Sequence, residues 1–554
     1  MKRDGVARTS ARPECRIVHC NQKRTAHFRV VHGIERNRRR PTGNHHGAGN
    51  YGEHPDLAQL PEGDKATYDA LCKADTVGMF QVESRAQMAS IVRNAPRRFY
   101  DIVVQVAIIR PGPIVGKMMH PYMRRRRKEE AITYPVESLR PVLERTLGVP
   151  LFQEQLLRMA MVVGGFTGTE AEELRKAVGM RRSWARMEVL MAKLRKGMAA
   201  NNIEPHTQEA IVGSIQSFAL YGFPESHAAS FALIAYASAY FKVHYLAAFT
   251  CAMLNNQPMG FYMPAVLIKD SQRHGLRVKP IDVQVSRDEC TVEHEPDGSL
   301  SLRLGLLYVK SLRRATAAAL VAARETHGPF RSIEDLSQRV PALSRKDLAQ
   351  LARIGALNWL DGVEHRRDAL WQVAEIGRPA GPLFRVTHED RSQVIAVSSS
   401  AWLGTSHGFS ALRQMSTDER LVADYAGTGV TAGPHPLSFR RKQLRAARIL
   451  SAAELHACPD KSYVTHAGAV IARQRPGTAL GFIFLSLEDE TGISNVIIHP
   501  DLYDYDRLLV TRGRFFLVHG RLQNQDGVVH VRAERLEELA LGLEQLTLQS
   551  HDFH

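Results

Sequence analysis

The chain has 554 residues, and its 73 Lys and Arg outnumber its 57 Asp and Glu to give a formal net charge of +16. This length suits roughly three or four domains of ~150 residues each, and the charge favours phosphate-rich partners. The longest apolar run, residues 228–241, is too short to span a bilayer, which takes ~20 residues. The six cysteines show no paired Cys-x-x-Cys spacing, which argues against a disulfide framework or a zinc site.

The first predicted segment, residues 1–50, is a basic tail. It holds twelve Lys and Arg against three Asp and Glu, so +9 of the net charge lies there. It is rich in Arg, His, Gly and Asn and has no periodic apolar face, a composition typical of a disordered segment. The N-terminus also lacks the apolar core of a signal peptide. With no membrane span predicted, we expect a soluble, cytoplasmic protein.

Residues 51–270 are expected to be mostly helical. Thr169-Glu-Ala-Glu172 fits a capping box, and the helix that it begins carries Arg175 and Lys176 toward its C-terminal end. Cations at that end ordinarily complement the helix dipole on a solvated face. The basic run from Arg124 to Lys128 is either a solvated face or a contact for template phosphates.

The most informative stretch runs from Tyr221 through Pro224 into the uncharged residues 228–241. Pro224 stops what precedes it, and Ser226 is a suitable N-cap for a long buried helix. A helix that begins there presents free N–H groups and a positive dipole end beside Ser226 and His227, which suits an anion. A capped core helix with a locally satisfied histidine is an equally good interpretation.

In residues 271–360, the stretches 304–312 and 344–357 resemble helix-hairpin-helix units. Hairpins of that kind hold the DNA backbone through N–H groups without reading sequence. Ser311 and Arg313 stand where the first hairpin usually has glycines, which puts close backbone approach to phosphate in doubt, whereas Lys310 still offers charge. Residues 361–460 are predicted to be a linker with short helices, in which 381–384 is either a clamp-binding peptide or a linker turn.

Residues 461–540 are predicted to form five short strands, at 467–471, 481–487, 493–498, 515–522 and 528–535. This spacing suits an OB-fold barrel, which binds single strands through a basic groove and stacked aromatic rings. The candidate DNA-binding residues are Arg473, Arg475, Phe482 and Phe484, and each Phe is as well explained by the barrel core. Residues 541–554 are a predicted tail.

The sequence contains few clustered carboxylates of the kind that holds catalytic metal ions. Two divalent cations need several oxygen ligands held in one place. The one Asp-x-Asp, Asp504-Tyr-Asp506, is interpreted as a solvated loop, and Glu488-Asp-Glu490 as a hairpin turn that ends at Gly492. No catalytic or metal-binding residue is therefore assigned.

Several long motifs resemble the C-family bacterial DNA polymerases, the polymerase III alpha-subunit or DnaE-type family, and most closely its error-prone, ImuC-like branch. The resemblance covers about residues 61–554 and matches the C-terminal portion of the family. Its motifs are 75–84, 106–113, 134–141, 151–155, 221–236, 475–478, 487–492 and 523–527.

The resemblance implies an α+β multidomain fold, with a polymerase fingers region at 51–270, tandem helix-hairpin-helix units at 271–360 and an OB-fold at 461–540. It places Arg175, Lys176, Ser226 and His227 at the nucleotide. Family members use Mg²⁺, yet neither the N-terminal PHP domain nor the palm aspartates are found in this sequence.

The function implied is that of an error-prone DNA-directed DNA polymerase, a nucleotidyltransferase that copies past damaged bases in replication, repair and the SOS response. Its expected partners are primer-template and single-stranded DNA, deoxynucleoside triphosphates, ImuA-type and ImuB-type proteins and the sliding clamp. The alternative is an inactive truncated fragment that still binds DNA and partner proteins.

Overall fold

The computed structural model describes residues 56, 59–110, 119–179, 184–218, 223–376, 412–477, 479–540 and 550–553. The predicted basic tail at 1–50 and the peptide at 381–384 lie outside these ranges. Within them, no helix combines the length and the apolar character that a membrane span requires.

The first part of the chain is helical, as predicted. Ser84 begins α3 by accepting the Gln87 N–H, and Gly165, with a φ of 66°, ends α8. A Cβ on Gly197 of α10 would lie 2.1 Å from the Gly164 carbonyl oxygen, so α8 and α10 need glycine to approach this closely. The elements here are α2 (Lys65–Cys72), α3 (Arg85–Asn94), α4 (Phe99–Ile108), α6 (Met119–Arg126), η4 (Glu137–Leu139), α7 (Arg140–Leu143), η5 (Glu144–Thr146), α8 (Gln153–Gly164), α9 (Gly168–Gly179), α10 (Trp184–Ala200) and α11 (Pro205–Phe218).

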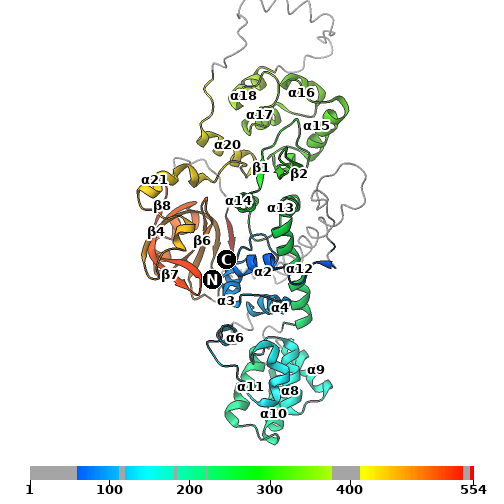
Figure 1. Ribbon diagram of the computed structural model, residues 1–554, viewed down its shortest axis with the longest axis vertical. Coiled ribbons are helices and arrows are strands. Elements are labelled where there is room, and N and C mark those ends of the chain that lie inside the picture. The colour runs from blue at the N-terminus through cyan, green and yellow to red at the C-terminus, as the bar shows by residue number, and fades with distance from the viewer. Residues whose placement is uncertain are drawn as a thin grey trace, which may run out of the picture.

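The long helix α12 (Glu225–His244) connects the two largest hydrophobic cores. One core, shared with α2, α4 and α8–α11, contains Ala228, Phe231, Ala232, Ala235, Tyr236 and Ala239 of this helix. Ala237 and Phe241 belong to a second core with α13 (Leu246–Asn255) and α14 (Pro264–Arg273). Figure 1 shows α8–α11 at one end of the molecule, with α12 and α13 leading toward the other end.

The region after α14 combines a small sheet with helices. In the sheet order β1-β3-β2, β1 (Arg277–Lys279) lies parallel and β2 (Thr291–His294) antiparallel to β3 (Leu300–Arg303). Ser311 has a φ of 72°, a left-handed conformation that glycine adopts most easily. The other elements are η6 (Leu306–Tyr308), α15 (Arg314–His327), α16 (Ile333–Arg339), α17 (Arg345–Arg353) and α18 (Arg366–Glu375), followed after the undescribed stretch by α20 (Thr417–Thr428), η8 (Pro436–Arg440), α21 (Arg441–Ala446) and α22 (Ala452–Leu455).

The C-terminal region is a closed five-stranded barrel, which confirms the predicted OB-fold and the α+β class. Its order is β5-β6-β8-β7-β4, and β4 closes the barrel by pairing with β5. The parallel β9 (His551–Phe553) adds to β4. The barrel elements are β4 (Tyr463–Gln474), β5 (Ile483–Glu488), β6 (Ile493–Ile498), α23 (Pro500–Tyr505), α24 (Arg507–Arg512), β7 (Phe515–Gln525) and β8 (Val528–Glu538).

The barrel is docked against the first helices (Figure 1). The Arg85 guanidinium of α3 lies 4.4 Å from the centroid of the Phe484 ring on β5. At the tip of the β7–β8 hairpin, Asp526 pairs with Arg93 at 3.3 Å and with Arg127 at 2.7 Å. Arg273 of α14 pairs with Glu488 of β5 at 2.9 Å.

Candidate nucleotide and nucleic-acid interface

The start of α12 differs from the sequence prediction. The N-cap is Pro224, in an extended conformation with φ −67° and ψ 139°, and Ser226 lies exposed in the first turn. The ring of Pro224 fixes this geometry, so the helix begins directly after it. The Glu225 N–H donates to the carboxylate of Glu154, 2.8 Å away. A carboxylate of the protein therefore already occupies part of this helix end.

His227 lies in an aromatic environment at the same helix end. Its ring centroid is 5.1 Å from that of Phe223 and 4.2 Å from that of Phe231. The Arg110 guanidinium lies 4.6 Å from the Phe223 ring centroid. The half-buried His227 thus packs between two aromatic rings, one of which also lies under a cation.

The cations of α9 lie on its outer face. Arg175 makes a bidentate contact with Glu172, at 2.8 and 2.6 Å, and the pKa of Glu172 is lowered by that hydrogen bond. Lys176 is also exposed, whereas Leu174 and Ala177 are buried in the core that α9 shares with α12. Arg175 and Lys176 therefore lie on the exposed face of α9. Ser226 and His227 lie at the start of α12, a different helix that packs in the same core.

The capping box of α9 is shifted by two residues from the prediction. The Thr167 N–H donates to Glu170 at 3.0 Å, and the Glu170 N–H donates to the Thr167 hydroxyl at 3.4 Å. Thr167 and Glu170 have the same spacing as Thr169 and Glu172, so the sequence offered both choices. The earlier box leaves Glu172 available to pair with Arg175.

A pocket of about 690 Å³ beside the start of α12 was not predicted. Its lining includes Arg97, Arg98 and Arg145. The Arg145 guanidinium lies 4.0 Å from the Tyr100 ring centroid and 3.5 Å from the Glu225 carboxylate. The adjacent pair Arg97 and Arg98 is a sequence signal, but the approach of Arg145 depends on the tertiary fold.

Two of the predicted DNA-binding residues, Arg473 and Lys310, have structural roles. Arg473 is buried, donates to the Val510 carbonyl at 2.8 Å, and pairs with Asp552 at 3.3 Å. The Lys310 ammonium donates to the Tyr425 carbonyl at 3.0 Å, at the C-terminal end of α20. Both cations satisfy carbonyl groups at helix ends.

The other three DNA-binding candidates lie on the barrel exterior. Arg85 covers Phe484, while Phe482 meets the His499 ring edge-on at a centroid distance of 5.1 Å. Arg475 is exposed, and its guanidinium lies 4.6 Å from the Tyr503 ring centroid. Neither Phe belongs to the barrel core, because the inward positions of β5 are Ile483, Leu485 and Leu487.

Asp504 and Asp506 do not form the predicted loop. Asp504 lies within α23, and Asp506 is the residue between α23 and α24. The helix begins at Pro500, where the His499 side chain accepts the Asp501 N–H. Proline at the first helical position favours this start, so the sequence between the strands becomes helical.

The described ranges contain one group of side chains with the spacing of metal ligands, Asp75, Asp270 and His274. The ammonium of Lys242 lies 2.9 Å from Asp75 and 2.8 Å from Asp270. Burial opposes the charge of Lys242, but the two carboxylates outweigh it and raise its pKa. The group does not fit a divalent cation, because a protonated amine already lies between its carboxylates.

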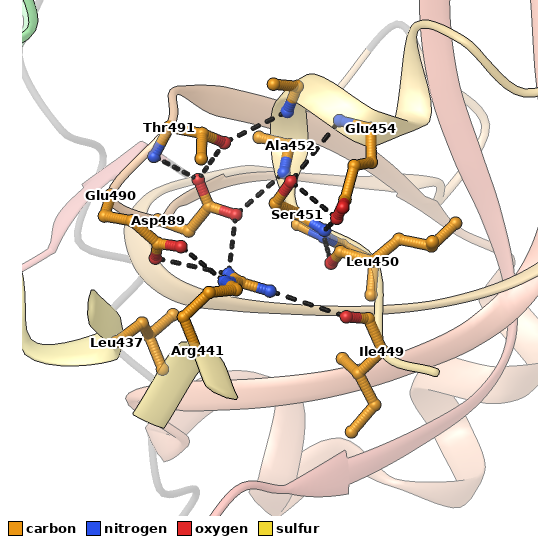
Figure 2. A network of polar contacts seen from close by, with 12 residues as sticks. Leu437, Arg441, Ile449, Leu450, Ser451, Ala452, Glu454, Asp489, Glu490 and Thr491 are labelled. Atoms are coloured by element: carbon orange, nitrogen blue, oxygen red, sulfur yellow. Dashed lines mark hydrogen bonds and ion pairs between the residues drawn. The ribbon is translucent and has the colours of Figure 1, made fainter. Parts of the chain in front are cut away.

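The predicted turn at 488–492 is the centre of a polar network (Figure 2). The buried Asp489 accepts hydrogen bonds from the Ala452, Thr491 and Gly492 N–H groups, at 2.7, 2.8 and 3.1 Å. Arg441 donates to Asp489 at 3.1 Å and also contacts Glu490. These carboxylates join α21 and α22 to the barrel, and their oxygens are taken up by protein donors.

Three family models match the chain in the order of its structural regions. The bacterial DNA polymerase III alpha subunit finger domain matches residues 45–202, a helix-hairpin-helix motif matches 275–369, and an OB-fold nucleic acid binding domain matches 464–539. Among solved structures, asparaginyl-tRNA synthetase from Pyrococcus horikoshii aligns with 18% of this chain and 26% of its own at 23% identity, with a TM-score of 0.15.

Curated relatives match nearly the whole chain. An error-prone DNA polymerase of Alkalilimnicola ehrlichii is 45% identical over 508 residues, covering 92% of this chain and 47% of the relative. That of Pseudomonas syringae pv. tomato is 45% identical over 502 residues, with 90% and 46% covered, and error-prone DNA polymerase 2 of Agrobacterium fabrum is 44% identical over 494 residues, with 89% and 44% covered. This chain, which spans about half the length of the curated relatives it matches, belongs to the bacterial error-prone DNA polymerases of the polymerase III alpha-subunit type.

Proposed function

We propose that this chain supplies nucleotide-binding and DNA-binding parts of an error-prone DNA-directed DNA polymerase, which copies template past damaged bases. The observation that carries the proposal is the 45% identity over 508 residues with a relative of that name. The proposed domains are fingers at 51–270, helix-hairpin-helix units at 271–360, a linker region at 361–460 and the OB-fold at 461–540. The proposed location is the cytoplasm, and the proposed role is translesion synthesis in the SOS response.

In this proposal, Arg175 and Lys176 hold the triphosphate of the incoming nucleotide, with Ser226 and His227 beside it. Exposed cations suit this role, because phosphate oxygens can displace the Glu172 carboxylate from Arg175. Lys176 has no fixed fork geometry and adds a point charge. The aromatic packing of His227 against Phe231 keeps its ring in one place while a ligand binds.

Mg²⁺ is the expected metal of the family, and it would neutralise charge on the transferred phosphoryl group. The described group of Asp75, Asp270 and His274 does not supply that site, because Lys242 bridges its carboxylates. The proposed ligands of this chain are primer-template DNA, single-stranded DNA and deoxynucleoside triphosphates. ImuA-type and ImuB-type proteins and the sliding clamp are the proposed protein partners.

The proposal is tested by titrating the full chain with fluorescent primer-template, with and without deoxynucleoside triphosphate. We expect binding to weaken steeply as salt rises. Binding releases cations that are condensed on the DNA, and a higher salt concentration opposes that release. We also expect the nucleotide complementary to the template to strengthen the complex more than a mismatched one. Binding that is absent even at low salt would refute the proposal.

A further inference from the structure

The outer surface of the barrel is divided into a covered part and an open part. The covered part holds Phe484, which lies under Arg85 of α3, and the hairpin tip with Asp526, which pairs with Arg93 and Arg127. His530, next to this tip on β8, has its pKa lowered to about 4 by burial. A strand of nucleic acid has no access to these side chains while α3 is in place.

The open part is a groove of about 590 Å³ along β7 and β8 beside the start of α23. Its lining includes Lys461, His499, Arg521 and Arg532, with Asp501 and Glu534. In the strand register, Arg521 of β7 is opposite Arg532 of β8, and Ile497 of β6 is the other neighbour of Arg532. Because cross-strand neighbours point to the same side, the two arginines share the exterior of the barrel.

The charges of the groove are only partly paired. Arg521 lies 3.2 Å from Glu534, whereas Nδ1 of His499 accepts the Asp501 N–H and so does not act as a cation toward Asp501. Lys461 and Arg532 are exposed, and neither has a carboxylate partner among the residues that the structure describes. Two unpaired cations in one groove suit consecutive phosphates of a polyanion better than an acidic side chain of the protein itself.

The same groove is lined by one ring, that of His499, and a second ring packs against it. The half-buried Phe482 meets His499 edge-on, and His499 is itself a lining residue. Unstacked bases pack on such rings whatever their sequence, and duplex bases are not free to do so. The combination of unpaired cations and an accessible ring therefore favours a single strand over a duplex.

We propose that a single-stranded nucleic acid crosses the exterior of β7 and β8 beside α23, with its phosphates on Lys461 and Arg532 and its bases on Phe482 and His499. This path avoids the part of the barrel that α3 covers. The inference rests on the proposed function, and it specifies which face of the barrel receives the strand.

The test compares the full chain with the double variant Lys461→Ala, Arg532→Ala in binding of fluorescent oligo-dT across a salt series. We expect affinity at low salt to fall about tenfold, and the slope of log affinity against log salt to fall by roughly 1.4, at about 0.7 for each lost phosphate contact. A control double variant, Lys442→Ala with Arg535→Ala, removes the same two residue types from exposed positions outside the groove and should leave both values unchanged.

A third variant, Phe482→Leu, should weaken oligo-dT binding without changing the salt slope, because it removes stacking and no charge. Circular dichroism of each variant checks that the barrel is folded. If the groove variant and the unaltered chain bind oligo-dT with equal affinity and equal salt slope, the inference is wrong and the proposed function stands. The same titration with a DNA duplex is the second readout, and an equal loss of duplex and single-strand binding in the groove variant would also contradict the inference. If the unaltered chain binds no DNA, both the inference and the proposed function are wrong.

Discussion

Asp489 shows how one buried carboxylate can hold several segments together. It accepts three backbone N–H groups and the Arg441 guanidinium, and its side chain is fully buried. Two of those N–H groups belong to its own turn, and the third begins α22. The negative charge therefore organises the turn and attaches a neighbouring helix.

We predict that Asp489→Ala lowers the free energy of unfolding by about 3 kcal/mol or more, because it leaves buried donors without an acceptor. Urea denaturation followed by circular dichroism measures the loss. The control is Asp501→Ala, whose carboxylate is 89% exposed and whose removal should change stability by no more than about 0.5 kcal/mol. Equal stabilities of the two variants would show that the Asp489 network adds nothing.

At the same scale, we predict that Arg175→Ala combined with Lys176→Ala weakens deoxynucleoside triphosphate binding roughly tenfold in calorimetry. Both cations lie on the exposed face of α9, so the fold should tolerate their loss. The control is Arg186→Ala on α10, which removes another exposed arginine that pairs with Glu173. An unchanged affinity in the double variant would identify these cations as an ordinary solvated face.

Single residues also show which contacts cannot be predicted from the sequence. Lys310 and Arg473 were predicted from charge and position, and the structure places each at a backbone carbonyl group, the exposed Lys310 at Tyr425 and the buried Arg473 at Val510. Charge can be counted from the sequence, but the acceptor that a cation reaches depends on segments far away in the chain. Tyr425, the acceptor for Lys310, is 115 residues away.

Among elements, the contact of the first helices with the barrel includes several charged side chains. Arg85 of α3 lies over Phe484, and Asp526 pairs with Arg93 of α3 and with Arg127, which follows α6. Partly exposed ion pairs contribute about 0.2–1 kcal/mol each. The ion pairs at the hairpin tip therefore add modestly to the stability of this contact.

We predict that Asp526→Ala speeds amide hydrogen exchange in the turn at 525–528 by up to about tenfold, because both ion pairs at the hairpin tip are lost. Mass spectrometry of peptides from this turn measures the change. Glu537→Ala removes a carboxylate from the other end of β8, where it pairs with Arg535, and should leave exchange in the turn unaltered. Protection that stays the same in Asp526→Ala would mean that the ion pairs do not hold the tip.

The strands were easier to predict than the helix starts. Alternating residues between Gly, Asn and Asp turns placed all five barrel strands, because β5, β6 and β7 have one face in the core. The start of α12 was assigned to Ser226, whereas Pro224 is the N-cap. Capping residues are frequent in sequence, and the choice between Thr167 and Thr169 depends on packing that local sequence does not contain.

For the whole molecule, we predict that the purified chain does not extend a primer with Mg²⁺ or Mn²⁺. Within the described ranges, the one group with metal-ligand spacing already surrounds the ammonium of Lys242. Phosphoryl transfer needs cations at the attacking oxygen, and in the proposed role Arg175 and Lys176 would only orient the triphosphate. A gel assay of primer extension decides this, and template-dependent products that disappear in Arg175→Ala would contradict the prediction.

The helix α12 is long enough to connect two separate parts of the molecule. Its twenty residues span about 30 Å, and it contributes side chains to both of the largest hydrophobic cores. Because close-packed cores deform little, a tilt of a few degrees at Glu225 would displace the side chains near Phe241. An anion that displaced Glu154 from the Glu225 N–H would therefore act on one end of a helix whose other end packs in the second core.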